Sequence, residues 1–185
     1  MQRECTGTNE PVKIYYTEEM FNNAVKHSKQ INGDSHLRNS FTKGKSTVWG
    51  CLGEEIVSVW TAGQIMDDFE YDVLTPLQKK LEVKTKKTTS SVCEANYEAS
   101  VCDFNSSQNC DYYVFVRVKV QETNDPSDMI AWICGYISKE EFKKKSVQFK
   151  KGDIDERNGY KVHADCNNLY YGDLMPLPAC DEELI

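Results

Sequence analysis

The segment from residue 46 to residue 66 constrains the fold of this chain more than any other feature. It carries only two charged residues, Glu54 and Glu55, in a stretch otherwise dominated by large apolar side chains. Ser46 or Thr47 at its start predicts a helix cap, and the apolar run that follows predicts about four turns of helix. Because a helix this apolar must be largely buried, the rest of the chain has to supply the layer that covers it.

Strand-like segments follow this helix. Runs of β-branched and aromatic residues predict strands at residues 69–74, 81–85, 112–120 and 130–137. Thr75-Pro76 lies between the first two strands and predicts a hairpin. The remaining patterns predict a short strand at residues 12–16, helices at residues 18–27, 94–109 and 139–145, and a short strand or two in an irregular tail at residues 152–185. This order predicts a single α/β domain over residues 1–185, with a mixed central β-sheet flanked by helices.

Length and composition set the protein class. A chain of 185 residues can bury a sizeable core without disulfides or structural metals. The first residues lack the apolar core of a signal peptide, and no stretch approaches the roughly 20 apolar residues of a membrane span. We therefore expect a cytoplasmic protein with no membrane contact, and its eight cysteines as reduced thiols.

A zinc site built from cysteines is not favoured by the spacing. The candidate ligands lie far apart along the chain, and no Cys-x-x-Cys pair occurs among them. They are Cys93, Cys102, Cys110, His163 and Cys166. We interpret these side chains as ordinary thiols and a surface or core histidine.

The net charge of −7 argues against a protein that coats DNA through a general positive field. Any contact with nucleic acid must therefore be local. The lysines available for such a contact flank the second predicted strand, and they are Lys79, Lys80, Lys86 and Lys87.

Two carboxylates and a lysine are predicted to meet on the hairpin. Strand alternation puts Glu82 and Lys84 on one face, about 7 Å apart, while Leu81 and Val83 point to the other. The hairpin would place Asp72 of the preceding strand beside Glu82. Like charges this close repel unless a divalent cation lies between them, and hard oxygen ligands suit Mg²⁺ or Mn²⁺.

The buried helix adds a third carboxylate. Gly50, Gly53, Glu54 and Val57 follow the spacing of one helix face, so two residues without side chains flank Glu54 and let the backbone approach the sheet. An ionised glutamate in so apolar a helix favours contact with a cation or a hydrated cleft. Glu55 competes with Glu54 for this role, and the glycine spacing favours Glu54.

Taken in order along the chain, these motifs resemble the core of the PD-(D/E)XK nuclease superfamily. The motifs are Gly50-x-x-Gly53-Glu54 on a helix, Tyr71-Asp72 at the end of one strand, and Leu81-Glu82-Val83-Lys84-Thr85 on the next. The strands at residues 111–116 and 135–138 resemble the remainder of that fold, so the similarity covers about residues 46–145. It is greatest to small phage or restriction-type endonucleases. The proline of the family name is absent, because Glu70-Tyr71 precedes Asp72.

The resemblance implies a restriction-endonuclease-like fold and a metal-dependent deoxyribonuclease, with endonuclease activity expected. In this family pattern Asp72 and Glu82 bind Mg²⁺ or Mn²⁺, Lys84 assists the attacking water, and Glu54 binds a metal directly or through water. Gln108 would be an accessory polar group. The substrate implied is DNA, held at its phosphates by the four flanking lysines, and RNA stays open as an alternative.

Two simpler interpretations compete with this one. About three acid-x-Lys triplets are expected by chance in such a composition, and two occur, the second being Glu141-Phe142-Lys143 on a predicted surface helix. Glu82 and Lys84 could thus be an ion pair on a solvated strand.

The rival function is a non-catalytic protein-binding module on the same fold. Cutting both DNA strands with one site would need a homodimer or two successive events, and no interface signature decides between them.

Overall fold

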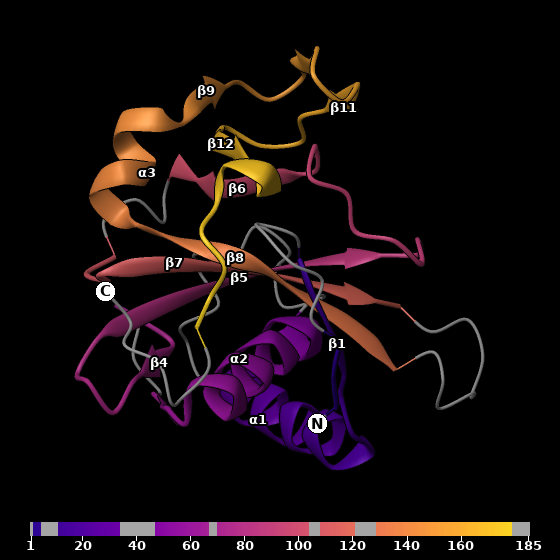
Figure 1. Cartoon of the computed structure of the whole chain (residues 1–185), viewed down its shortest axis with the longest axis vertical. Coiled ribbons are helices and arrows are strands. Elements are labelled where there is room, and N and C mark those ends of the chain that lie inside the picture. Colours follow the sequence, from indigo (N-terminus) through magenta and orange to yellow (C-terminus); the bar gives the residue numbers. More distant parts are fainter. Residues whose placement is uncertain are drawn as a thin grey trace.

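Seven strands form one mixed sheet at the centre of the computed structural model (Figure 1). The structure describes residues 2–4, 11–33, 47–66, 70–103, 108–120 and 129–178. The sheet has the order β1-β2-β8-β7-β5-β4-β3, in which β5 and β7 are parallel and all other neighbours antiparallel. Its strands are β1 (Gln2–Glu4), β2 (Val12–Tyr15), β3 (Gln64–Ile65), β4 (Val73–Leu74), β5 (Lys80–Thr88), β7 (Tyr112–Lys119) and β8 (Ile130–Ser138).

The central sheet is covered on both faces (Figure 1). Helices α1 (Glu18–Gly33) and α2 (Thr47–Thr61) cover one face. A small sheet of order β6-β12-β9 covers the other, and a separate hairpin, β10–β11, lies beside it. The remaining elements are β6 (Glu98–Cys102), α3 (Lys139–Lys145), β9 (Val147–Phe149), β10 (Ile154–Asp155), β11 (Tyr160–Lys161), β12 (Cys166–Tyr170) and the 3-10 helix η4 (Tyr171–Asp173).

This arrangement explains the continuous apolar runs of β7 and β8. Val114 and Val116 of β7 pack into the core under α1 and α2, while Tyr113 and Phe115 pack into a second core under the small sheet. Strands buried on both faces lose the polar side of the usual alternation. The described part is therefore one α/β domain with a mixed sheet and three α-helices.

The helix predictions around α1, α2 and α3 are confirmed. The N–H of Met20 donates to Oγ1 of Thr17 at 3.2 Å, which makes Thr17 the N-cap of α1. α1 continues six residues beyond the predicted end at residue 27 and stops at Gly33. α3 has the predicted bounds, and its cap Ser138 accepts the N–H of Glu141. None of the described helices combines the length and the apolar character needed to cross a bilayer.

Two predictions are wrong, one of a helix and one of a strand. The helix predicted at residues 94–109 is replaced in part by strand β6, whose partner β12 is more than 60 residues away in sequence. Its polar and apolar spacing suited either structure, and the distant partner decided between them. The strand predicted at residues 69–74 shrinks to Val73–Leu74, and residue 69 lies outside the described residues. The predicted hairpin is confirmed, since β4 pairs antiparallel with β5.

Candidate active site

Asp72 lies beside β5 because the hairpin holds it there. Val73 pairs with Leu81, so the hairpin register carries Asp72 next to Glu82. The N–H of Asp72 donates to the carbonyl of Leu81 at 2.9 Å, and the N–H of Val83 donates to Oδ2 of Asp72 at 2.7 Å. The backbone and the carboxylate of Asp72 are thus each held by one hydrogen bond to the backbone of β5.

Glu82, Lys84 and Gln108 form a closed triangle of hydrogen bonds. Nζ of Lys84 lies 2.5 Å from Oε1 of Glu82, and Nε2 of Gln108 donates to the same oxygen at 2.8 Å. Lys84 also donates to Oε1 of Gln108 at 3.2 Å. Gln108 is itself anchored, because the ammonium of Lys139 at the start of α3 donates to its carbonyl oxygen.

The second carboxylate oxygen of Glu82 is in a different situation. Glu82 is only 3% exposed, and its Oε2 is buried with no hydrogen-bond partner among the described residues. A buried carboxylate oxygen without a donor is costly, so the place next to Oε2 suits a cation or an ordered water. Together with the carboxylate of Asp72, this gives the acidic site a donor set of hard oxygens.

Electrostatics link all four residues that the sequence singled out. Burial raises the pKa of Asp72 well above its usual value, and the charges of Glu82 and Glu54 raise it further. Lys84 and the hydrogen bond from the N–H of Val83 act in the opposite direction but do not outweigh these effects. The charges of Glu82, Glu54 and Lys84 therefore all act on the carboxyl of Asp72.

Glu54 on α2 faces a second group of ligand-type side chains. Its Oε2 lies 3.7 Å from Nδ1 of His27 on α1, and the donor atoms of His27, Cys51 and Glu54 all lie within 4.8 Å of one another. Within the described ranges this is the one set of three His, Cys, Asp or Glu residues so closely spaced. Glu54, Asp72 and Glu82 do not form such a set among the described residues.

Sequence reasoning missed His27 and Cys51. Cys51 precedes Glu54 by three residues, so helical spacing alone could have placed both on one face of α2. The position of His27 could not be found in this way, because it depends on how α1 packs against α2.

The predicted lysines divide into two separate groups. Lys79 and Lys80 lie at the start of β5, where Nζ of Lys80 is 5.2 Å from the centre of the Tyr71 ring. Lys86 and Lys87 lie near the end of β5. Six residues of extended strand separate Lys80 from Lys86, which corresponds to about 20 Å. The two groups flank the acidic site rather than forming one patch.

Lys86 and Lys87 also differ from each other. Lys87 is exposed, whereas the ammonium of Lys86 lies 2.7 Å from Oε1 of Glu98 on β6. Burial lowers the pKa of Lys86, although the charge of Glu98 opposes this. Lys86 is thus engaged in an ion pair and is less available to DNA phosphates than the sequence suggested.

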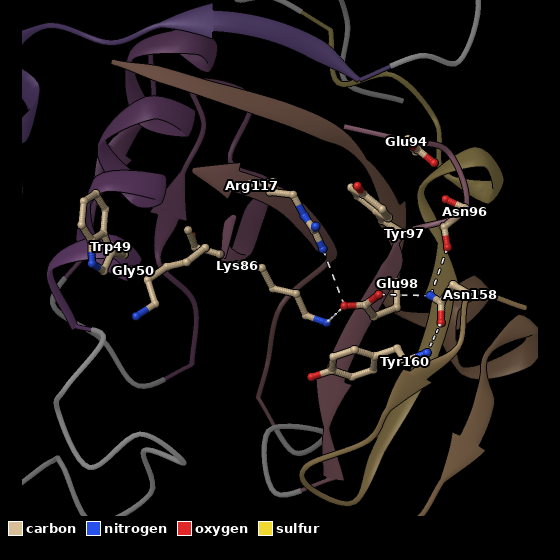
Figure 2. Close-up of a pocket in the computed structure, with 12 residues that line it drawn as sticks. Trp49, Gly50, Lys86, Glu94, Asn96, Tyr97, Glu98, Arg117, Asn158 and Tyr160 are labelled. Atoms are coloured by element: carbon tan, nitrogen blue, oxygen red, sulfur yellow. Dashed lines mark hydrogen bonds and ion pairs between the residues drawn. The ribbon is translucent and has the colours of Figure 1, made fainter. Parts of the chain in front are cut away.

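A pocket of about 800 Å³ opens beside this ion pair (Figure 2). Lys86 and Arg117 both point toward Glu98, with Nη2 of Arg117 3.6 Å from Oε1, and Asn158 donates to Oε2 at 3.1 Å. The aromatic residues in its wall are Trp49, Tyr97 and Tyr160. Burial raises the pKa of Glu98, but the charges of Lys86 and Arg117 outweigh it, so the pKa lies below its ordinary value.

The pocket extends toward the acidic site. A smaller cavity of about 250 Å³ has Lys84 in its wall and shares Thr85, Lys86 and Glu98 with the larger one. Sequence reasoning missed Glu98 because β6 was predicted as a helix. Arg117 carried a usable signal, since it is a charged residue inside the otherwise apolar run of β7.

No known family model matches the chain, and no curated protein sequence is significantly similar to it.

Proposed function

We propose that this protein is a divalent-metal-dependent nuclease that hydrolyses DNA phosphodiester bonds, with an endonuclease mode and a restriction-endonuclease-like core. The observation that carries the proposal is the environment of Glu82. One of its oxygens is held by Lys84 and Gln108, while the other is buried with no hydrogen-bond partner among the described residues. In an ion pair on a solvated strand, both carboxylate oxygens would instead be accessible to water.

The carboxylates fit a hard divalent cation. Asp72 and Glu82 repel each other in the absence of positive charge, and Glu54 adds to that repulsion. Oxygen ligands of this kind suit Mg²⁺ or Mn²⁺. Such a cation, when bound, would supply positive charge for the phosphate oxygens and make water more acidic.

Lys84 is placed to act on the reacting groups. Glu82 and Gln108 hold its ammonium from two directions, which leaves the third N–H to orient the attacking water or to offset charge on the phosphate. In the hydrolysis a bond forms between the water oxygen and phosphorus while one phosphorus–oxygen ester bond breaks. The proton that water loses is balanced by the one that the leaving alkoxide gains.

The surroundings of the site favour a nucleic-acid substrate. The net charge of −7 requires that phosphate contacts be local, and Lys79, Lys80 and Lys87 flank the acidic site along β5. The neighbouring pocket of about 800 Å³ is large enough for a nucleotide and offers aromatic faces for a base. These features favour a DNA strand that passes along β5.

The test is cleavage of circular and linear DNA with Mg²⁺ or Mn²⁺. Glu82→Gln and Lys84→Ala should each lower the rate by about 100-fold or more, as expected for groups that act on the transition state. Glu141→Gln and Lys143→Ala are matched controls, because they change the second acid-x-Lys triplet on exposed α3. Both controls should cut like the wild type.

Cleavage of closed circles by the wild type establishes the endonuclease mode, because a circle has no ends. Equal cleavage by wild type and by Glu82→Gln would place the hydrolysis elsewhere and refute the assignment of this site. Absence of cleavage with either metal, together with no Mn²⁺ binding by calorimetry, would favour the protein-binding module instead.

A further inference from the structure

His27, Cys51 and Glu54 form a second cluster of potential metal ligands, between α1 and α2. An imidazole, a thiol and a carboxylate present their donor atoms within 4.8 Å of one another. Cys51 is only 1% exposed, and the side chains of His27 and Glu54 are each 17% exposed. The cluster is therefore mostly buried but keeps a route to solvent.

The donor types select the class of cation. Thiolate and imidazole ligands suit Zn²⁺, which is borderline soft, and do not suit Mg²⁺. Three protein ligands with a fourth open position is a common zinc arrangement. This differs from the pair of carboxylates at Asp72 and Glu82, which offers hard oxygens alone.

The spacing is also close to what Zn²⁺ needs. Ligand atoms placed tetrahedrally around Zn²⁺ at its usual bond lengths lie about 3.4 to 3.8 Å from one another. His27 Nδ1 and Glu54 Oε2 are 3.7 Å apart, and the thiol lies within 4.8 Å of both. Small side-chain rotations would bring the three atoms to one ion.

Glu54 connects this cluster to the acidic site. Its Oε2 faces His27, while its negative charge also acts on Asp72. A cation held by His27 and Cys51 would fix this carboxylate on the α1 side and withdraw its charge from Asp72. A cation at either place would therefore draw on the same carboxylate.

We propose that His27, Cys51 and Glu54 bind Zn²⁺, and that Zn²⁺ bound there inhibits DNA cleavage by holding Glu54 at this cluster, away from the acidic site. The binding part stands by itself, and the inhibition part rests on the proposed nuclease function. The proposal concerns a borderline-soft cation with a regulatory effect, not the hard cation of the reaction.

The binding part is tested with Zn²⁺ alone, by competition against a chelating dye. His27→Gln and Cys51→Ser should each weaken the affinity by at least about tenfold. Cys166→Ser, a buried thiol on β12, is the matched control and should bind like the wild type. Circular dichroism on all variants verifies folding, and Cys51→Ala replaces Cys51→Ser if the serine variant does not fold. Equal affinity in wild type and both site variants would overturn the proposal.

Co²⁺ provides a spectroscopic readout that an ordinary helix contact would not produce. Co²⁺ bound through a thiolate gives a sulfur-to-cobalt charge-transfer band. This band should appear in the wild type and in Cys166→Ser but not in Cys51→Ser. Its persistence in Cys51→Ser would assign the metal to another cysteine and contradict the site.

The inhibition part is tested by DNA cleavage in Mn²⁺ with increasing Zn²⁺. The wild type should be inhibited, and Cys51→Ser should need at least about tenfold more Zn²⁺ for half-inhibition. Equal inhibition of both proteins would overturn the regulatory role. If the wild type cuts no DNA, the nuclease proposal fails, while the dye and Co²⁺ measurements still decide whether the zinc site exists.

Discussion

Thr85 of β5 occupies the space in which a side chain at Gly53 of α2 would lie. A Cβ added at Gly53 would overlap Oγ1 of Thr85 and crowd its Cβ at 3.1 Å. The backbone of α2 therefore touches the strand that carries Glu82 and Lys84. The charge of Glu54, the next residue on the helix, raises the pKa of Asp72.

Gly53→Ala should destabilise the protein by about 1–3 kcal/mol, because Thr85 is β-branched and cannot move aside without strain. Helix propensity alone would favour alanine by about 1 kcal/mol. Gly50→Ala is the matched control, since the nearest atom to its Cβ would be Oε1 of Glu54 at 4.0 Å. It should be neutral or more stable in urea unfolding. Similar results for both variants would contradict the close contact.

Asp72→Asn should raise the thermal stability of the metal-free protein by a few degrees. It removes a carboxylate that the charges of Glu82 and Glu54 both repel, and the amide oxygen can still accept the N–H of Val83. The same variant should lose the stabilisation that Mn²⁺ confers on the wild type. Melting curves in EDTA and in Mn²⁺ check both effects. A variant that is less stable in EDTA, or that Mn²⁺ still stabilises fully, would count against an acidic metal site.

Glu98→Gln should lower the free energy of unfolding by about 1–3 kcal/mol at neutral pH. The change leaves the cations of Lys86 and Arg117 facing each other without a counter-charge. The expected loss of stability is smaller than for breaking a fully buried ion pair, because the Lys86 side chain is 28% exposed. Glu141→Gln, an exposed carboxylate paired with lysines on α3, is the control and should change stability by less than about 0.5 kcal/mol. Urea unfolding at pH 7 compares the two.

The pH dependence of the same pair of proteins gives an independent check. The pKa of Glu98 in the folded state lies below its usual value, so the unfolded state binds the proton more readily. Its contribution to stability is therefore complete above the unfolded pKa of about 4.3 and is lost as the pH falls through the lower, folded pKa. The stability difference between wild type and Glu98→Gln should shrink as melting curves are taken from pH 7 down to pH 3. A constant difference would mean that the charge of Glu98 is not responsible.

Tyr160→Leu should weaken substrate binding if the pocket beside Lys86 holds a nucleotide. Loss of one stacking face raises KM for single-stranded DNA by at least about fivefold and leaves kcat close to wild type. Tyr15→Leu on β2 is the control, because Tyr15 lies outside the pocket wall. A fall in kcat with KM unchanged would assign Tyr160 to another role.

Local patterns of the sequence were sufficient for much of the candidate site. Strand alternation placed Glu82 and Lys84 on one face, and a short turn predicted the hairpin that sets Asp72 beside them. The paired glycines of α2 indicated the close approach at Gly53. These features depend on residues near one another along the chain, so sequence periodicity reports them directly.

Other parts were decided by contacts between distant segments. β6 is a strand because it pairs with β12, although residues 94–109 have a spacing that also suits a helix. Glu98 meets Lys86 and Arg117 for the same reason.

The sequence by itself determined the hairpin, the buried helix and the shared face of Glu82 and Lys84, because each depends on backbone periodicity within a short segment. Only the tertiary structure decided which way Glu54 turns, and it turns toward His27 and Cys51. The packing of α1 against α2 controls that choice, and no spacing within α2 encodes the identity of the neighbouring helix.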